Sequence, residues 1–133
     1  MKTVFADTFF FLAVLNPSDS AHKAALALSR QLTNPRVTTA WVLTEVADAM
    51  SEASNRAAFL EFFNFLKQNK FTTIVGASET LFDRGIEFYS KRPDKNWSLT
   101  DCISFVVMQD LEIDEALTGD HHFEQAGFRA LLK

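Results

Sequence analysis

Four acidic residues of this 133-residue chain each lie where a carboxylate would stand at the end of a secondary-structure element. Asp7 follows the apolar segment 3–6, and Glu45 interrupts an otherwise apolar helical segment. Asp101 opens a nearly unbroken hydrophobic segment, and Asp120 follows another apolar segment late in the chain. Carboxylates far apart in sequence can converge at one edge of a sheet, and a cluster of oxygen ligands suits a hard divalent cation. The pattern therefore predicts metal-dependent phosphate chemistry.

The composition is that of an ordinary globular protein, with 47% hydrophobic and 23% charged residues. The length predicts a single domain over residues 1–133. No apolar run approaches the roughly 20 residues that span a bilayer, and the start of the chain lacks an export signal. A single cysteine excludes an internal disulfide and suits a reducing compartment. We therefore expect a cytoplasmic protein that is not inserted in a membrane.

The net charge of −4 argues against a broad basic surface of the kind that binds polyanions. Four clustered acids that hold metal would account for the whole excess of negative charge. The charge therefore weighs against nucleic-acid binding without excluding it.

Strands and helical segments alternate along the chain. Apolar and β-branched runs predict strands at 3–6, 36–38, 71–75, 113–118 and 128–132. Helical spacing and capping signals predict helices at 8–15, 21–32, 55–68, 78–90 and 101–110, and a further helix, capped by Thr39, that carries Glu45. Such alternation predicts an α/β fold, an α/β/α sandwich around a mostly parallel sheet. Ligands of such sheets bind beyond the carboxyl ends of the strands, where Asp7 and Asp120 lie.

Each acid also has a purely structural explanation. Asp7 could cap a helix, and Asp120 could belong to a turn after Gly119. Glu45 has apolar neighbours on both helix faces, so a salt bridge is its structural alternative. Ser98-Leu99-Thr100-Asp101 matches the capping-box pattern, in which an acid in the first turn also favours the helix dipole. No single acid is specific, and their joint placement carries the inference.

The histidine pair His121 and His122 beside Asp120 suggests zinc as another possibility. The chain has one cysteine and only one further histidine, His22, so a zinc ligand set is poorly supplied. Other acids lie on polar helix faces and are expected in solvent: Asp48, Glu61, Glu79 and Asp83.

Taken together, the acidic segments resemble the PIN domain, and more narrowly the VapC-type toxins of prokaryotic toxin–antitoxin pairs. The matching segments are Val4–Thr8, Thr38–Glu45, Asp94–Ser104 and Ala116–Phe123, so the resemblance spans nearly the whole chain. The most distinctive pieces are Ser-Leu-Thr-Asp-Cys in the third segment and Thr-Gly-Asp-His-His-Phe in the fourth. Relatives usually show Thr-x-Asp, one further residue and His-Phe, which keeps Asp120, His122 and Phe123 in register.

The resemblance implies an endoribonuclease that depends on Mg²⁺ or Mn²⁺. The family's first three acids map onto Asp7, Glu45 and Asp101, and its fourth, more variable acid maps onto Asp120. Asp7 and Asp101 would then bind metal directly, and Glu45 would bind it or orient the attacking water. Asp120 would hold a second metal or a metal-bound water. Hydroxyls often occur near these acids in the family, here at Thr8, Ser98, Thr100 and Thr118. Carboxylates packed together repel one another until a divalent cation neutralises them, which agrees with this role.

Other folds with a first-strand aspartate fit less well. Haloacid-dehalogenase-like phosphatases need a second acid two residues later, where this chain has Phe9, and a response-regulator receiver needs an acidic pair after the first strand. The remaining alternative is a PIN fold that binds RNA or assembles with partners and has little activity. The presence of all four acids favours catalysis.

Beside RNA, the resemblance implies two protein partners, namely a second copy of the chain in a homodimer and a small antitoxin. The aromatic run Phe9–Phe11 and the broad stripe from Phe59 to Leu66 could supply apolar contact surfaces or simply a phenylalanine-rich core. Lys91, Arg92 and Lys95 form a basic cluster before Asp101, which could steer a phosphate backbone or could be a solvated loop.

Overall fold

The computed structural model describes all 133 residues and has a five-stranded, entirely parallel sheet at its centre. The strand order is β3-β2-β1-β4-β5. The strands are β1 (Val4–Ala6), β2 (Arg36–Thr39), β3 (Thr72–Val75), β4 (Glu115–Leu117) and β5 (Arg129–Ala130). The central strand β1 is buried along its whole length, because it has a neighbouring strand on each edge and helices over both faces. The predicted α/β fold with a parallel sheet is confirmed.

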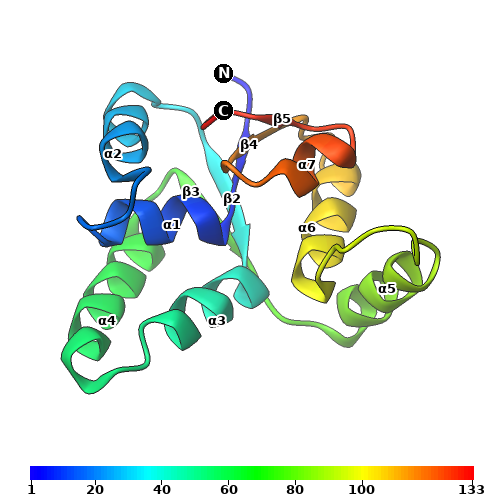
Figure 1. The fold of residues 1–133 in the computed structure, drawn as a ribbon, viewed down its shortest axis with the longest axis horizontal. Coiled ribbons are helices and arrows are strands. Elements are labelled where there is room, and N and C mark those ends of the chain that lie inside the picture. The colour runs from blue at the N-terminus through cyan, green and yellow to red at the C-terminus, as the bar shows by residue number, and fades with distance from the viewer.

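Helices cover both faces of the sheet and make the three layers of an α/β/α sandwich (Figure 1). The helices are α1 (Thr8–Leu15), α2 (His22–Gln31), α3 (Ala40–Ala49), α4 (Ala53–Gln68), α5 (Glu79–Ser90), α6 (Leu99–Asp110) and α7 (His121–Gln125). Helices α1, α2 and α4 lie on one side and α5, α6 and α7 on the other, while α3 continues from the carboxyl end of β2 (Figure 1). Both termini lie at the opposite end of the sheet from α3 (Figure 1).

Capping signals in the sequence set where several helices begin. The Thr39 hydroxyl accepts a hydrogen bond of 3.1 Å from Val42 N at the start of α3, and Ser78 accepts one from Leu81 N at the start of α5. The predicted boundaries agree with the structure within about two residues. The exception is α7, which forms where the sequence predicted only a turn after Gly119.

Helix α6 is apolar on almost every side. It therefore packs between the sheet and α5, which covers the face turned away from the sheet. Every residue from Asp101 to Met108 is buried. The two helices approach closely at Gly85, where an added Cβ would overlap the side chain of the fully buried Ile103. This contact fixes α5 against α6, the helix that carries Asp101 in its first turn.

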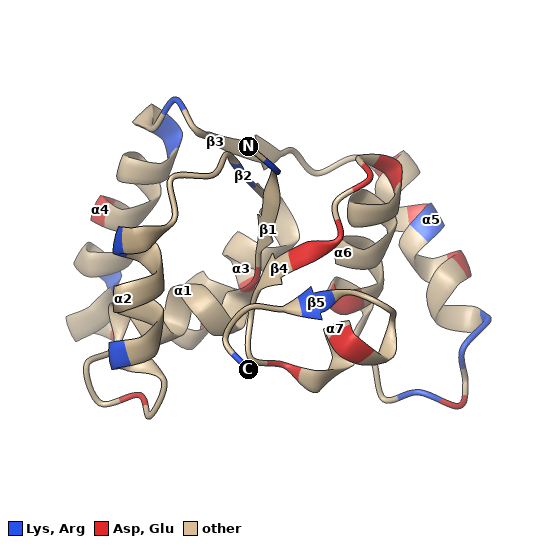
Figure 2. Ribbon diagram, turned by 90° about the horizontal axis from the view of Figure 1, so that it is seen from above, with Lys and Arg blue, Asp and Glu red and all other residues tan.

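None of the helices combines the length and the apolar character needed to cross a membrane. Lysine and arginine residues lie on several elements, among them α2, α5, β5 and the loop that follows α5, and acidic residues lie on α3, α6 and α7 as well as on α4, α5 and β4 (Figure 2).

Candidate functional site

Asp7 and Asp120 meet because their strands are parallel neighbours. Ala6 of β1 pairs with Leu117 of β4, so both chains leave the sheet at the same edge. Asp7 begins α1 and Asp120 begins α7, as N-cap residues. Between them lies Thr118, whose buried hydroxyl donates a hydrogen bond of 3.0 Å to Asp7 Oδ2 and accepts one of 3.0 Å from Asp120 N. The structure thus brings both predicted residues to the carboxyl edge.

Asp101 reaches the same edge from the first turn of α6. The predicted capping box is present: Ser98 Oγ accepts a hydrogen bond from Asp101 N at 3.0 Å, and Ser98 N donates to Asp101 Oδ2 at 3.2 Å. His122 Nδ1 lies 3.0 Å from the same oxygen, Oδ2. Because the cap and the histidine share Oδ2, capping leaves the other carboxylate oxygen available to a ligand.

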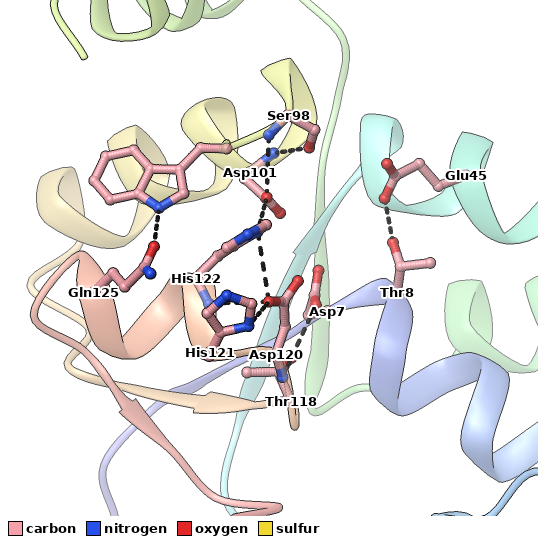
Figure 3. A network of polar contacts seen from close by, with 11 residues as sticks. Asp7, Thr8, Glu45, Ser98, Asp101, Thr118, Asp120, His121, His122 and Gln125 are labelled. Carbon is pink, nitrogen blue, oxygen red and sulfur yellow. Dashed lines mark hydrogen bonds and ion pairs between the residues drawn. The ribbon is translucent and has the colours of Figure 1, made fainter. Parts of the chain in front are cut away.

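Glu45 faces this group from α3, on the far side of the site (Figure 3). Its side chain is half-buried, and its partner is the Thr8 hydroxyl, which donates a hydrogen bond of 2.6 Å to Oε1. The salt bridge that offered a structural explanation for Glu45 is not formed. Thr8 directly follows Asp7, so this bond fixes α3 relative to the start of α1.

Burial and mutual repulsion raise the pKa values of three of these acids. The pKa of Asp7 rises to about 7, first because the carboxyl is buried and then because Asp101 and Glu45 are negatively charged nearby. Burial is also the main cause of the raised pKa of Glu45, where Asp101 and Asp120 add repulsion. Burial likewise raises the pKa of Asp101, with a contribution from Asp120. The four acids therefore share one electrostatic site.

An all-carboxylate site of this kind fits a hard divalent cation. Its donors are oxygens from four chain segments, and ionisation of Asp7, Glu45 and Asp101 together at neutral pH is costly without a compensating positive charge. A bound cation would supply that charge and return the pKa values toward their ordinary range.

His122 also belongs to the site, although the sequence indicated it only as a poorly supported zinc ligand and as a residue of the final motif. Its Nδ1 lies 3.0 Å from Asp101 Oδ2 and 3.5 Å from Asp120 Oδ1, so the ring links two acids that come from different helices (Figure 3). The sequence signal was its place after Asp120 in the final motif. The ligand atoms of Asp120, His121 and His122 also lie within 4.8 Å of one another. This cluster gives little support to the zinc alternative, because His121 is largely exposed and His122 Nδ1 is already shared by two carboxylates.

The acids expected in solvent are exposed, and the basic cluster lies in the loop after α5, where Lys91 is exposed and Arg92 and Lys95 are half-buried. Lys91 pairs with Glu87 at 2.8 Å, and Arg92 pairs with Asp94 at 3.0 Å. The Arg92 guanidinium also lies 4.9 Å from the centre of the Trp97 ring. Two of the three cations are therefore partly neutralised.

The free thiol of Cys102 lies directly after Asp101 in α6 and is buried. Burial, and then the neighbouring charge of Asp101, raises the pKa of Cys102 to about 11. The thiol is therefore an inert packing group rather than a nucleophile.

Comparisons with known proteins agree with this architecture. The structure is similar to the crystal structure of VapC20 from Mycobacterium tuberculosis, described as a sarcin–ricin loop cleaving toxin, with a TM-score of 0.86, 24% sequence identity, and coverage of 94% of this chain and 95% of that one. It is also similar to the crystal structure of FitAcB from Neisseria gonorrhoeae, with a TM-score of 0.64, 14% identity, and coverage of 96% and 94%. At these identities the likeness shows the fold. No curated protein matches the sequence.

The sequence also matches the family model of the PIN domain over residues 4–129. This match includes all four acidic positions and nearly the whole chain, and the chain therefore belongs to the PIN domain family.

Proposed function

We propose that this PIN-domain chain is a divalent-metal-dependent endoribonuclease of the VapC type, the toxin of a cytoplasmic toxin–antitoxin pair. The observation that carries the proposal is the convergence of Asp7, Glu45, Asp101 and Asp120 at one edge of the sheet, with the pKa of Asp7 raised to about 7. A structural role alone would not require so many partly or fully buried acids in one place.

The four acids have different tasks in this proposal. Asp7 and Asp101, the two most buried, bind Mg²⁺ or Mn²⁺ directly. Glu45 binds the cation or orients the attacking water, and its Thr8 partner holds it in position. Asp120, which is more exposed, holds a second cation or its water. A cation bound there supplies Lewis-acid activation of the phosphate and of water.

RNA is the proposed substrate class. VapC20, which has the same fold over nearly its full length, is described as cleaving the sarcin–ricin loop, an RNA element. A hairpin that carries this loop is therefore the first defined substrate to test, beside RNA of mixed sequence.

An apolar groove on the opposite side of the sheet from α6 supports the proposed antitoxin partner. The hollow has a volume of about 510 Å³ and is lined mainly by apolar side chains of α1 and α4, including Phe10, Phe11, Val14, Phe62 and Phe65. Its lining also includes one cation and one anion, Arg36 and Glu61. We propose that an amphipathic helix of the antitoxin binds in this groove through its apolar face.

The proposed homodimer has a second surface available. Phe82, Ile86 and Tyr89 are exposed and recur at helical spacing along one face of α5. An apolar stripe on an outer helix is a suitable contact for a second copy of the chain.

The proposal is tested by incubating purified protein with both RNAs in Mg²⁺ or Mn²⁺, beside two matched variants. Asp101→Asn removes a proposed ligand, whereas Asp48→Asn changes an exposed acid of α3 outside the site. We expect cutting by the wild type and Asp48→Asn, strongly reduced cutting by Asp101→Asn, and none in EDTA. Equal cutting by all three proteins would identify a contaminant. RNA binding without cutting would favour the alternative, a PIN-fold binding module.

A further inference from the structure

We infer that the exposed ring of Phe9 is a stacking platform for an unpaired nucleobase next to the scissile phosphate. The inference rests on the proposed ribonuclease function and specifies how the site recognises its substrate. The platform would recognise the flat face of a base rather than a particular sequence.

Phe9 is the exposed member of three consecutive phenylalanines. Its exposed fraction is 38%, whereas Phe10 and Phe11 are 2% and 4% exposed. Phe9 lies in the first turn of α1, two residues after Asp7 and directly after Thr8, which holds Glu45. A large aromatic side chain beside a buried acidic site is more informative than an exposed apolar residue elsewhere, because it borders the place where substrate must lie.

The ring has a defined position, and Gly119 is the evidence for it. A Cβ added at Gly119 would lie 2.6 Å from Phe9 Cζ and 2.7 Å from Cε1, so the tip of the ring lies against the glycine backbone. Gly119 does not have the left-handed backbone conformation that would itself require glycine, in contrast to Gly127. The space taken by the ring therefore accounts for glycine at this position.

This contact places the ring between two acid-bearing segments. Gly119 stands between Thr118, which bonds to Asp7, and Asp120 itself. The ring thus extends from the start of α1 to the loop between β4 and α7, along the border of the acidic site.

An aromatic platform also suits the charge of the protein. The 13 Lys and Arg residues are outnumbered by 17 Asp and Glu residues, and two of the three loop cations are already paired, so the protein as a whole attracts a phosphate backbone weakly. Stacking of a base on an aromatic ring contributes about 1–3 kcal/mol, and it needs neither positive charge nor a particular base. A hydrocarbon ring also does not compete with the acids for the cation.

The test compares Phe9→Leu, Phe9→Trp and the wild type on a single-stranded RNA and on the same RNA with an abasic nucleotide beside the cleaved bond. We expect Phe9→Leu to lower kcat/KM on the intact RNA about 5- to 150-fold, and Phe9→Trp, which keeps an aromatic face but must shift at Gly119, to lower it less than Phe9→Leu does. On the abasic RNA the leucine variant should equal the wild type, because the stacking partner is gone. The apparent affinity for Mn²⁺ should not change.

Two further variants complete the design. Phe71→Leu is the matched control, because Phe71 is also exposed but lies at the opposite, amino-terminal end of the strands. Gly119→Ala should displace the ring and lower kcat/KM in the wild type, but should have little further effect when Phe9 is already leucine.

Equal kcat/KM for Phe9→Leu and wild type would overturn the platform while leaving the ribonuclease intact. A loss that persists in full on the abasic RNA would also overturn it, since the ring would then act on the acids rather than on a base. Absence of RNA cleavage by the wild type would refute the proposed function, and the platform with it.

Discussion

Thr118 Oγ1 donates a hydrogen bond of 3.0 Å to Asp7 Oδ2, although the two residues are 111 positions apart in the sequence. Thr118 Oγ1 also accepts a hydrogen bond from Asp120 N, so one buried hydroxyl sets the relative position of two acids. A threonine is suited to this role because its hydroxyl donates and accepts at once.

Replacing Thr118 by valine should weaken metal binding, because valine keeps the volume but provides neither donor nor acceptor. We expect the apparent affinity for Mn²⁺ to fall about 10- to 100-fold, as is usual when an outer partner of a metal ligand is removed. Isothermal titration would measure it. Thr118→Ser keeps the hydroxyl and should bind nearly as the wild type does; a serine variant as weak as the valine variant would contradict this account.

The stability of the metal-free protein should decrease as pH rises. The pKa of Asp7 is about 7 in the folded protein against an ordinary 3.8, so between these values the folded state holds more protons than the unfolded state. The resulting stabilisation is complete below about pH 4 and is lost by about pH 7, with a total of up to about 4 kcal/mol. Raised pKa values at Glu45 and Asp101 act in the same direction.

Denaturant unfolding in EDTA across this pH range would measure how the free energy of unfolding falls with pH. The Asp7→Asn variant should show a smaller fall, since asparagine has no proton to lose. Saturating Mn²⁺ should stabilise the wild type more at high pH than at low pH. A free energy of unfolding that rises with pH in EDTA would contradict the assigned direction.

Gly85→Ala should destabilise the protein, because the new methyl group would overlap Ile103 at the contact between α5 and α6. Overpacking of this kind costs about 1–3 kcal/mol, which outweighs the gain of up to about 1 kcal/mol from replacing glycine in a helix. Thermal unfolding would measure the difference. Gly76→Ala is the matched control, because nothing lies within 4 Å of its added Cβ, and it should leave the melting temperature nearly unchanged.

Charge reversal at Lys91 and Arg92 should weaken RNA binding without removing metal binding. Lys91 is exposed and Arg92 is half-buried over the Trp97 ring, and both form surface ion pairs that solvent screens and that contribute little to stability, so the double variant should fold. Fluorescence anisotropy with labelled RNA would give the affinity and its dependence on salt. An affinity equal to that of the wild type would show that this loop is solvated and takes no part in steering.

Local signals in the sequence predicted much of the fold, whereas the partners of the acids required the structure. Ser98 and Asp101 form the expected capping box because both partners lie within one helical turn. The bond from Thr8 to Glu45 joins residues 37 positions apart and depends on how α1 meets α3. Likewise, the linking role of His122 needs α6 and α7 side by side.

Two smaller features had no periodic signal to reveal them. A run of three phenylalanines does not indicate which ring is exposed, because that depends on the space left by Gly119. Helix α7 has only five residues, too few for a helical repeat to be recognised.

The burial of Cys102 has a practical consequence. Because Cys102 is the single cysteine and its buried thiol has a pKa of about 11, thiol-directed reagents should not react with the folded protein. A cysteine introduced on the surface could then carry a fluorophore or spin label at one chosen place. In the unmodified chain, the rate of alkylation would report how often α6 separates from its neighbours, without any label at all.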